Sequence, residues 1–381
     1  MKVAHLCLAN YYSDGYGYQE NELVKSHVKA GHDVVVVAST EKYIDNLNVG
    51  IVSPGRYYGS EGALVIRVPY LPLIPLSLAR KIRAHQRVYE TLKEIEPDVI
   101  VFHGLAGWDL RAARKYCEEY PGVVFYADCH ADFNNSAKSF VSKNILHKLY
   151  YKWIIKSCLH KIKKVLCISL ESLDFCKKVY GLNEERLEFY PLGGRLVGDE
   201  EYHLTRQRIR NRLGVSDSET IFLQSGKFSA PKRVQDSLAA FAATRREDFK
   251  YFLVGSVPDS ERPSFEGGLF NDARVSYLGW KSSDELYDLL CAADVYVQIG
   301  SQSATMQASL CARCAVILAD VPSHVPFMNN NGWLVTTVDS VVQAFKEIEQ
   351  DPARVTDMGR RSFEVARRLL DYDVLSERLL R

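Results

Sequence analysis

The feature that most constrains the fold of this 381-residue chain is a repeated alternation of short apolar segments with longer amphipathic ones. In the first half, the segments expected to be strands are 3–8, 33–39, 64–68, 98–104, 123–128 and 164–169. Several are unbroken apolar runs rich in β-branched residues, which is typical of strands buried on both faces of a parallel sheet. Amphipathic patterns over 19–31, 79–96 and 107–119 predict helices between them.

The same alternation restarts after about residue 215. The strands expected there are 220–226, 250–256, 274–280, 293–299, 315–320 and 332–337. Alternating strands and helices joined by short loops predict a doubly wound α/β sheet, so two such runs predict two Rossmann-like parallel-sheet domains. The polar segment 193–220 lacks a strand pattern and is where we expect the domain boundary. A last helical stretch, about 352–380, is longer than one domain needs.

Composition excludes several classes of protein. The net charge is +1, which gives no reason to expect a nucleic-acid partner. Nine cysteines without framework spacing indicate reduced thiols in a cytosolic compartment. Cys311 and Cys314 form a C-x-x-C that the helical pattern places mid-helix, without a second pair for a metal. No run of 18 apolar residues occurs, so we expect a chain that does not cross a membrane.

A glycine-containing turn follows the first predicted strand. Gly15 and Gly17 stand between that strand and a helix expected to start near Gln19. Glycines there let the backbone approach a phosphate or sugar, and a helix N-terminus favours anions. The plain alternative is that the turn needs the glycines for its own geometry, since G-x-G-x-x-G is not completed.

A second candidate is the segment "GKFSAPKR" (226–233), directly after the strand that opens the second half. Lys227 and Lys232 would stand at the carboxyl end of that strand and the start of the next helix. Two ammonium groups there could neutralise a diphosphate through charge-assisted hydrogen bonds. The alternative is a pair of solvated lysines in a surface loop.

Histidines end two neighbouring strands of the first half. His130, in "FYADCHADFNNS", is placed to hydrogen-bond a sugar or to orient an acceptor, and His103 has a similar but weaker claim. Lone histidines are more often structural. No H-x-x-x-H and no paired acid cluster occurs, so we predict no metal.

An acid-free stretch from Phe133 to Leu170 contains eight lysines. Lys148, Lys152 and Lys156 recur every four residues, along one helix face, with Leu149, Tyr150, Trp153, Ile154 and Ile155 nearby. A basic amphipathic helix with interfacial aromatics is the pattern of a contact with an anionic membrane surface. The alternatives are a solvated helix face and a nucleic-acid contact.

The segment "DVYVQIGSQSATMQASLCARCAVILAD" (294–320) reads as strand, loop, helix and strand. Its loop, from Gly300 to Thr305, presents the N-terminus of a helix that carries no acid. That is how a sheet protein offers main-chain N–H groups to an anionic ligand.

These pieces, in this order, resemble the retaining glycosyltransferases of family 4, which have the GT-B fold. "GYGYQENELVKSHVKAGHDVVVVAS" is similar to the family's glycine loop, first helix and second strand, and "PLGG" to the segment before its interdomain linker. "SGKFSAPKR" resembles its G-[RK]-x(4)-K phosphate motif, which matches Gly226, Lys227 and Lys232. "YFLVGSVP", "VSYLGWKSSDELYDLLCAADVYV" and "NGWLV" follow in the family's order.

The chain departs from the family in its E-x(7)-E motif. Gln307 stands where a glutamate contacts the nucleotide ribose, and Ile299 where the other glutamate belongs; Gln302 or Gln298 could replace it only if the loop is reshaped. Ala312 replaces the glycine after the helix. A neutral amide at 307 can still pair with ribose hydroxyls, but it loses charge assistance worth about 1 kcal/mol per bond.

The resemblance implies two domains facing a cleft: 1–197 on the acceptor side, joined by a helix over about 362–381, and 198–361 on the donor side. It implies a nucleotide-diphosphate sugar as donor, no cofactor and no metal, with the diphosphate held by Lys227, Lys232 and the main chain of Ser303, Ala304 and Thr305. Gly15, Gly17, Gly226 and Gln307 would border the donor, Gln302 its sugar, and His130 would contact that sugar.

We therefore expect a glycosyltransferase acting with retention on a glycan or lipid-linked acceptor, in cell-surface polysaccharide synthesis. Its expected location is cytoplasmic, with peripheral contact at the inner face of the membrane. The alternative from another class is a non-catalytic GT-B homologue that binds a sugar nucleotide or a partner transferase. A GT-B sugar-nucleotide epimerase fits the order of motifs less well.

Overall fold

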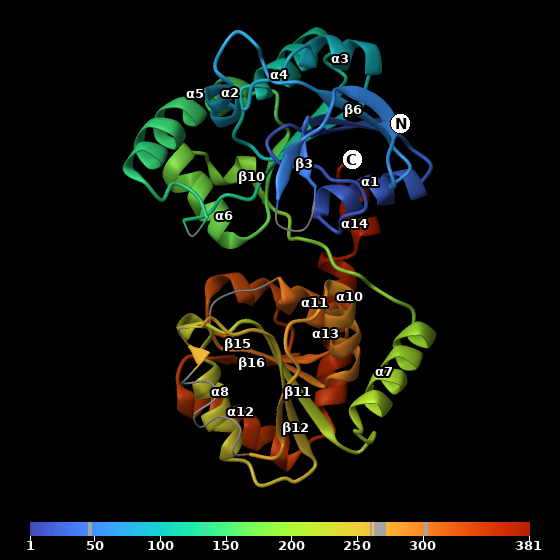
Figure 1. Cartoon of the computed structure of the whole chain (residues 1–381), viewed down its shortest axis with the longest axis vertical. Coiled ribbons are helices and arrows are strands. Elements are labelled where there is room, and N and C mark those ends of the chain that lie inside the picture. Colours follow the sequence, from blue (N-terminus) through green and yellow to red (C-terminus); the bar gives the residue numbers. More distant parts are fainter. Residues whose placement is uncertain (45–47, 134, 260, 263–271, 301–303) are drawn as a thin grey trace. The chain divides into compact units, whose positions relative to one another are not determined.

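The computed structural model describes residues 1–381 except 45–47, 134, 260, 263–271 and 301–303. The chain forms two compact units, each built on its own parallel sheet (Figure 1). Unit 1 comprises Met1–Leu192 and Tyr372–Arg381, and unit 2 comprises Gly193–Asp371. The sequence analysis placed the boundary at 197/198 and the start of the returning helix at about 362. In the structure, the divisions fall at 192/193 and 371/372.

The sheet of unit 1 has eight strands in the order β10-β9-β8-β7-β1-β2-β6-β5. Their bounds are β1 (Lys2–Cys7), β2 (Asp33–Ser39), β5 (Gly55–Tyr58), β6 (Leu64–Val68), β7 (Val99–Phe102), β8 (Val124–Cys129), β9 (Lys164–Cys167) and β10 (Leu187–Phe189). All pairs are parallel except β5 with β6. The six predicted strands are present. The sequence missed β5, whose residues are all exposed, and the three-residue β10.

A small antiparallel pair, β3 (Glu41–Tyr43) and β4 (Val49–Ile51), lies outside that sheet. The helical elements of unit 1 are α1 (Gln19–Lys29), α2 (Leu76–Ile82), α3 (Val88–Ile95), α4 (Leu110–Glu119), the π-helix η1 (Val141–Tyr151), α5 (Lys152–Cys158), α6 (Leu170–Phe175), the π-helix η2 (Cys176–Tyr180), the short 3-10 helix η3 (Glu184–Arg186) and α14 (Tyr372–Arg378). α1 and α14 pack against each other and belong to the same unit.

The prediction of one helix over 79–96 is wrong, because α2 and α3 are separate. Arg83 and Arg87 both have φ near 54°, a left-handed conformation that ends a right-handed helix. Between them, the buried His85 donates from Nδ1 to Asp109 at 2.7 Å, and its backbone N–H also points to that carboxylate. The break is therefore fixed by a tertiary contact with no glycine or proline to announce it.

The sheet of unit 2 has six strands, all parallel, in the order β13-β12-β11-β14-β15-β16. Their bounds are β11 (Thr220–Lys227), β12 (Phe249–Ser256), β13 (Val275–Tyr277), β14 (Val295–Gln298), β15 (Ala315–Ala319) and β16 (Gly332–Val335). The helical elements are α7 (Asp199–Leu213), η4 (Ala230–Lys232), α8 (Val234–Ala242), α10 (Ser283–Ala292), α11 (Thr305–Cys311), η5 (Pro322–Phe327), α12 (Val338–Gln350) and α13 (Arg354–Leu369). This strand order is that of a doubly wound nucleotide-binding sheet, so the prediction for this half is confirmed.

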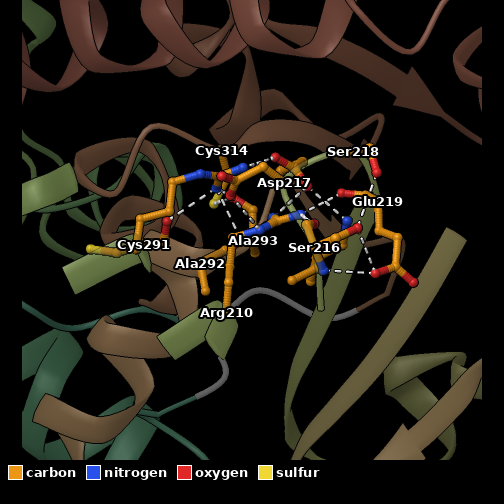
Figure 2. Close-up of polar contacts among 12 residues, drawn as sticks. Arg210, Ser216, Asp217, Ser218, Glu219, Cys291, Ala292, Ala293 and Cys314 are labelled. Carbon is orange, nitrogen blue, oxygen red and sulfur yellow. Dashed lines mark hydrogen bonds and ion pairs between the residues drawn. The ribbon is translucent and has the colours of Figure 1, made fainter. Parts of the chain in front are cut away.

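The polar segment expected to hold the domain boundary contains the helix α7, whose Arg210 and Arg206 bind it to the rest of unit 2. Arg210 is 1% exposed. It donates to the backbone carbonyls of Ala292 at 2.9 Å, Ser216 at 2.6 Å and Glu219 (Figure 2). Arg206 donates to the same Ala292 carbonyl at 3.0 Å. Ala292 ends α10, so these guanidinium groups satisfy carbonyls at the negative end of a helix.

The cysteines are buried free thiols throughout the described chain. Cys311 is the last residue of α11, and Cys314 follows two residues after the C-cap, so the expected mid-helix position of the C-x-x-C is wrong. The Cys314 thiol donates to the carbonyl of Leu290 at 3.3 Å. Packing accounts for these thiols. Among the described residues, no helix is long and apolar enough to span a membrane.

Candidate functional site

Each sheet reverses its strand order at one point, between β1 and β7 in unit 1 and between β11 and β14 in unit 2. Ligands of doubly wound sheets bind at the carboxyl ends of the strands beside such a point. We therefore describe what stands at the ends of these strands, unit by unit.

In unit 2, three glycines meet at the ends of adjacent strands. A Cβ on Gly255 would lie 1.8 Å from the carbonyl oxygen of Gly226, and one on Gly300 would lie 2.2 Å from that of Pro231. Gly226 and Gly255 also have φ of 139° and 151°, which side chains rarely allow. The ends of these strands therefore pack backbone against backbone, so main-chain groups line this edge of the sheet.

Lys232 lies within this packed region. Its side chain is buried, and its Cε lies 3.0 Å from where a Cβ of Gly226 would be. Burial lowers the pKa of Lys232. Lys227, at the end of β11, is exposed. The structure therefore places the two predicted phosphate-binding lysines differently, with only Lys232 held in the loop.

In the segment 294–320, the predicted helix is α11, which begins at Thr305 with Ala304 as its N-cap. In its first turn, the Gln307 N–H donates to the carbonyl oxygen of Ala304 at 3.1 Å. Gln307 is half-buried in the first turn. Among the predicted residues here, Ser303 and Gln302 lie outside the described residues.

Ile299, which aligns with the first glutamate, and Gln298, considered as its replacement, both lie in the core. Gln298 is 2% exposed; its Nε2 faces the Nε2 of His324 at 3.2 Å, and its Oε1 accepts from the Tyr296 hydroxyl at 3.3 Å. Ile299 is 1% exposed and packs in the apolar core. Neither side chain is available to a ligand in this arrangement, so the described loop carries no carboxylate at these positions.

In unit 1, His130 follows β8 and forms an ion pair with a buried carboxylate. Its Nε2 lies 3.3 Å from Oδ1 of Asp128, while its side chain remains 40% exposed. Burial by itself would lower the pKa of His130, but the Asp128 carboxylate raises it to about 9. His130 is therefore an imidazolium at neutral pH, with one side open to solvent.

The predicted glycine turn is fastened by Glu61, a residue the sequence analysis did not consider. One Glu61 oxygen accepts from the Gly15 N–H at 2.8 Å and from Asn21 at 2.9 Å. The Gly15 amide is thus already paired, whereas Gly17 is exposed. The first turn of α1 carries two acids, Glu20 and Glu22, so its dipole is already matched by negative charge.

The lysine stripe lies on η1 and α5. Lys148, Trp153 and Lys156 are exposed and Lys152 is half-buried, whereas Ile154 and Ile155, expected beside the stripe, are fully buried in the core. The exposed apolar residues are others: Phe140, Val141, Ile145, Leu149 and Trp153. From 141 to 153 they recur every four residues, so lysines and apolar side chains share this surface.

Two family models match the chain, one per unit. Residues 19–193 match the model "Glycosyltransferase Family 4", and residues 205–365 match "Glycosyl transferases group 1". Together the two matches span most of the chain. The chain belongs to glycosyltransferase family 4.

A curated relative of this family 4 chain is an alpha-monoglucosyldiacylglycerol synthase from Streptococcus pneumoniae, 24% identical over 230 residues. That match covers 59% of this chain and 48% of the relative, so the chain matches about half of the relative's length. The sequence order of motifs had predicted this family.

Two solved structures share the fold of the whole chain. Sucrose-phosphate synthase from Thermosynechococcus elongatus has a TM-score of 0.65 at 17% identity, with 99% of this chain and 97% of that one covered. Anabaena Alr3699/HepE, solved in complex with UDP, has a TM-score of 0.67 at 14% identity, with 100% and 98% covered. The family 4 chain therefore has the GT-B fold, as predicted.

Sequence reasoning missed the residues that support the predicted ones. Asp128 pairs with His130, Gly255 packs against Gly226, and Gly300 packs against the main chain of Lys232. A polar residue at the end of a buried strand is a usable signal for Asp128, but the mutual packing of distant glycines leaves no pattern in one sequence. Within the described ranges, no group of three or more His, Cys, Asp or Glu residues could hold a metal ion.

Proposed function

We propose that this family 4 chain transfers a sugar from a nucleotide-diphosphate sugar to a glycan or lipid-linked acceptor, with retention of configuration and without a metal. The observation that carries the proposal is the glycine-packed strand ends of unit 2, with Lys232 buried among them and the N-terminus of α11 following Gly300. Main-chain N–H groups and an ammonium group together suit a diphosphate.

The proposed reaction needs no protein base. The acceptor hydroxyl attacks the anomeric carbon on the face from which the diphosphate leaves, and a diphosphate oxygen takes the hydroxyl proton. Lys232, assisted by Lys227, stabilises the charge that develops on the leaving group. His130 contacts the donor sugar, where its imidazolium donates a hydrogen bond.

A thermal-shift panel of UDP-, GDP- and ADP-sugars tests donor binding. A donor at 100 times its dissociation constant adds about 2.7 kcal/mol to the free energy of unfolding, so the melting temperature rises only for the base the protein accepts. UDP bound to Alr3699/HepE makes UDP-sugars the first choice. No shift with any of the three classes at saturating concentration would contradict the proposal.

We further propose that the acceptor is presented by an anionic membrane. The supporting surface is formed by Phe140, Val141, Ile145, Leu149 and Trp153 together with the exposed Lys143, Lys148 and Lys156. Exposed apolar side chains interleaved with lysines suit the interface of an anionic bilayer, where each lysine contributes about 1 kcal/mol. The curated relative is named as a glycolipid synthase, which agrees with a lipid-linked acceptor.

Liposome co-sedimentation tests the membrane contact. Replacing Lys148, Lys152 and Lys156 together by Glu should lower binding to vesicles containing anionic lipid by about a hundredfold or more. The matched control replaces the exposed Lys25, Lys178 and Lys346 by Glu and should retain most binding. Equal binding by the stripe variant and this control would refute the proposal.

A second candidate function is a non-catalytic homologue that binds a sugar nucleotide or a partner transferase. The observation in its favour is the absence of a carboxylate at Gln298, Ile299 and Gln307. Release of nucleoside diphosphate from the donor separates the two candidates: an enzyme releases it slowly without acceptor and stops when Lys232 is replaced by Ala. Binding without any release would favour the non-catalytic homologue.

A further inference from the structure

A hydrogen-bonded chain of three buried histidines runs through unit 1, from the backbone of α14 to Asp128 on β8. His27 lies with Nε2 3.0 Å from the carbonyl oxygen of Ser376 and Nδ1 3.0 Å from Nε2 of His5. His5 Nδ1 lies 2.9 Å from Nε2 of His103. His103 Nδ1 lies 2.5 Å from Oδ2 of Asp128. All three histidines are at most 1% exposed.

The number of protons in this chain follows from its two ends. Both ends are acceptors, a backbone carbonyl and a carboxylate, and four hydrogen bonds lie between them. A neutral imidazole donates one hydrogen bond and accepts one, so three neutral rings supply only three of the four protons. A buried pair of facing lone pairs is costly. The chain is therefore complete only when one ring is an imidazolium.

The surroundings place that excess proton next to Asp128. The carboxylate already accepts from the Gly104 N–H at 2.6 Å and faces His130, so it is held as an anion. Burial lowers the pKa of His27 to about 4 and that of His5 well below its usual value. Both rings therefore remain neutral, and His103, in contact with the carboxylate, is left to carry the charge.

We propose that the three buried histidines hold one excess proton beside Asp128. This proton sets how strongly the Asp128 carboxylate stabilises the protonated form of His130. When His103 is an imidazolium, Asp128 shares its charge between two cations. When His103 is neutral, the full charge of the carboxylate acts on His130. The histidines and Asp128 are positioning residues, because they act through His130. This last step rests on the proposed contact of His130 with the donor.

Other ionisable groups face the chain from each element packed against it. They are Cys7 on β1, Glu20 on α1, His32 after α1, Cys129 on β8 and Tyr190 after β10. An exposed Lys29–Asp373 ion pair joins α1 and α14. Burial raises the pKa of Cys7 and of Tyr190 well above their usual values, so both stay neutral. Glu20 adds to Asp128 in raising the pKa of His130.

Nitrogen-15 NMR of the full chain with labelled histidine tests the proton count without any substrate. At about pH 7.5, where an ordinary histidine is largely neutral, one of the three buried rings should have both nitrogens protonated. We expect it to be His103, with His5 and His27 protonated at Nε2. Single substitutions assign the signals. Three neutral rings at this pH would overturn the proposal.

Two substitutions of His5 distinguish the effect of the excess proton from the effect of side-chain packing. His5→Phe fills the space but leaves His103 Nε2 without an acceptor, so the signal of the doubly protonated ring should be lost and the pKa of His130 should rise. His5→Gln can accept from His103 and donate to His27, so both signals should stay as in the native protein. An unchanged His130 titration in His5→Phe would overturn the proposal.

Turnover supplies an independent readout. With the preferred donor, the pH dependence of kcat in His5→Phe should move in the same direction as the pKa of His130, while KM for the donor changes less. If no donor is turned over at all, the proposed function fails, yet the NMR measurements still decide whether the excess proton exists. The two failures are thus distinguishable.

Discussion

The two sheets of this protein present different chemical groups at the carboxyl ends of their strands. Beside the switch point of unit 1, side chains meet: the buried His103 and Asp128 and the partly exposed His130 form a charged, hydrogen-bonded cluster. Beside the switch point of unit 2, backbone meets backbone, because Gly226 and Gly255 let the ends of β11 and β12 touch. The same doubly wound architecture thus supports one site made of titratable groups and another made of main-chain groups and a single buried lysine.

The difference fits the ligand that we propose for each place. Main-chain N–H groups keep their polarity at every pH, which suits an anion that is always charged. An imidazolium beside a carboxylate, such as His130 with its pKa of about 9, can donate a hydrogen bond and can also lose its proton, which suits hydroxyl groups. We therefore expect unit 1 to be broken by changing a charge and unit 2 by adding a methyl group.

The largest effect is expected in unit 1. Asp128→Ala leaves His103 and the Gly104 N–H unpaired in the core and should lower the free energy of unfolding by about 3–5 kcal/mol. Asp128→Asn should cost less, because its amide can accept from Gly104 and donate to His103. Hydrogen exchange of β7 and β8 measures this, with unit 2 peptides as the internal control. Equal losses in both variants would contradict this account.

In unit 2, the corresponding change is Gly255→Ala. The new Cβ would lie 1.8 Å from the Gly226 carbonyl oxygen, at a φ of 151°, so the strand ends must separate. We expect a loss of about 3 kcal/mol, seen as faster exchange in β11 and β12. Gly198→Ala, where nothing lies within 4 Å, is the matched control. Similar exchange in the two variants would show that the packed glycines are not needed.

Lys232→Ala should affect chemistry more than folding. Loss of a buried cation from the leaving-group site should lower kcat by about 10²-fold. Lys227→Ala should have a smaller effect, because Lys227 is exposed. Steady-state rates with the preferred donor give the comparison, and thermal melting shows whether each variant is folded. An equal loss in both would mean that the exposed lysine contributes as much as the buried one.

The smallest effect concerns the pH dependence of unit 1. The pKa of His130 is raised to about 9 in the folded chain, from 6.5 for an ordinary histidine. The stabilisation by its ion pair is therefore complete below about pH 6.5 and is lost as the pH rises toward about 9. Urea unfolding of the native protein and of His130→Gln should converge across this window. A constant difference would place the His130 pKa elsewhere.

Much of the fold could be predicted because burial leaves a local trace. The twelve strands expected from apolar runs are present, since a strand covered on both faces must be apolar along its length. Exposed or very short strands such as β5 and β10 carry no such trace. The order of loose motifs was also sufficient for the family, which the two model matches show.

The surface of lysines and apolar side chains on η1 and α5 shows the limit of such patterns. The lysine spacing selected η1 and α5, but it could not tell that Ile154 and Ile155 are buried while Leu149 is exposed. A helical period gives the relative positions of side chains, not which side of the helix packs on the protein. The packing of α5 against α4 decided that.

The sequence by itself determined the two sheets, the positions of His130, Lys227 and Lys232 at strand ends, and the membership of family 4. Only the tertiary structure decided that Lys232 is buried while Lys227 is exposed, that distant glycines touch, and that three histidines join into one chain ending at Asp128. The physical reason is the distance along the sequence over which each effect acts. Periodicity and propensity act between near neighbours, whereas a hydrogen bond between residues 98 positions apart, such as that of His5 with His103, exists only once the strands have paired.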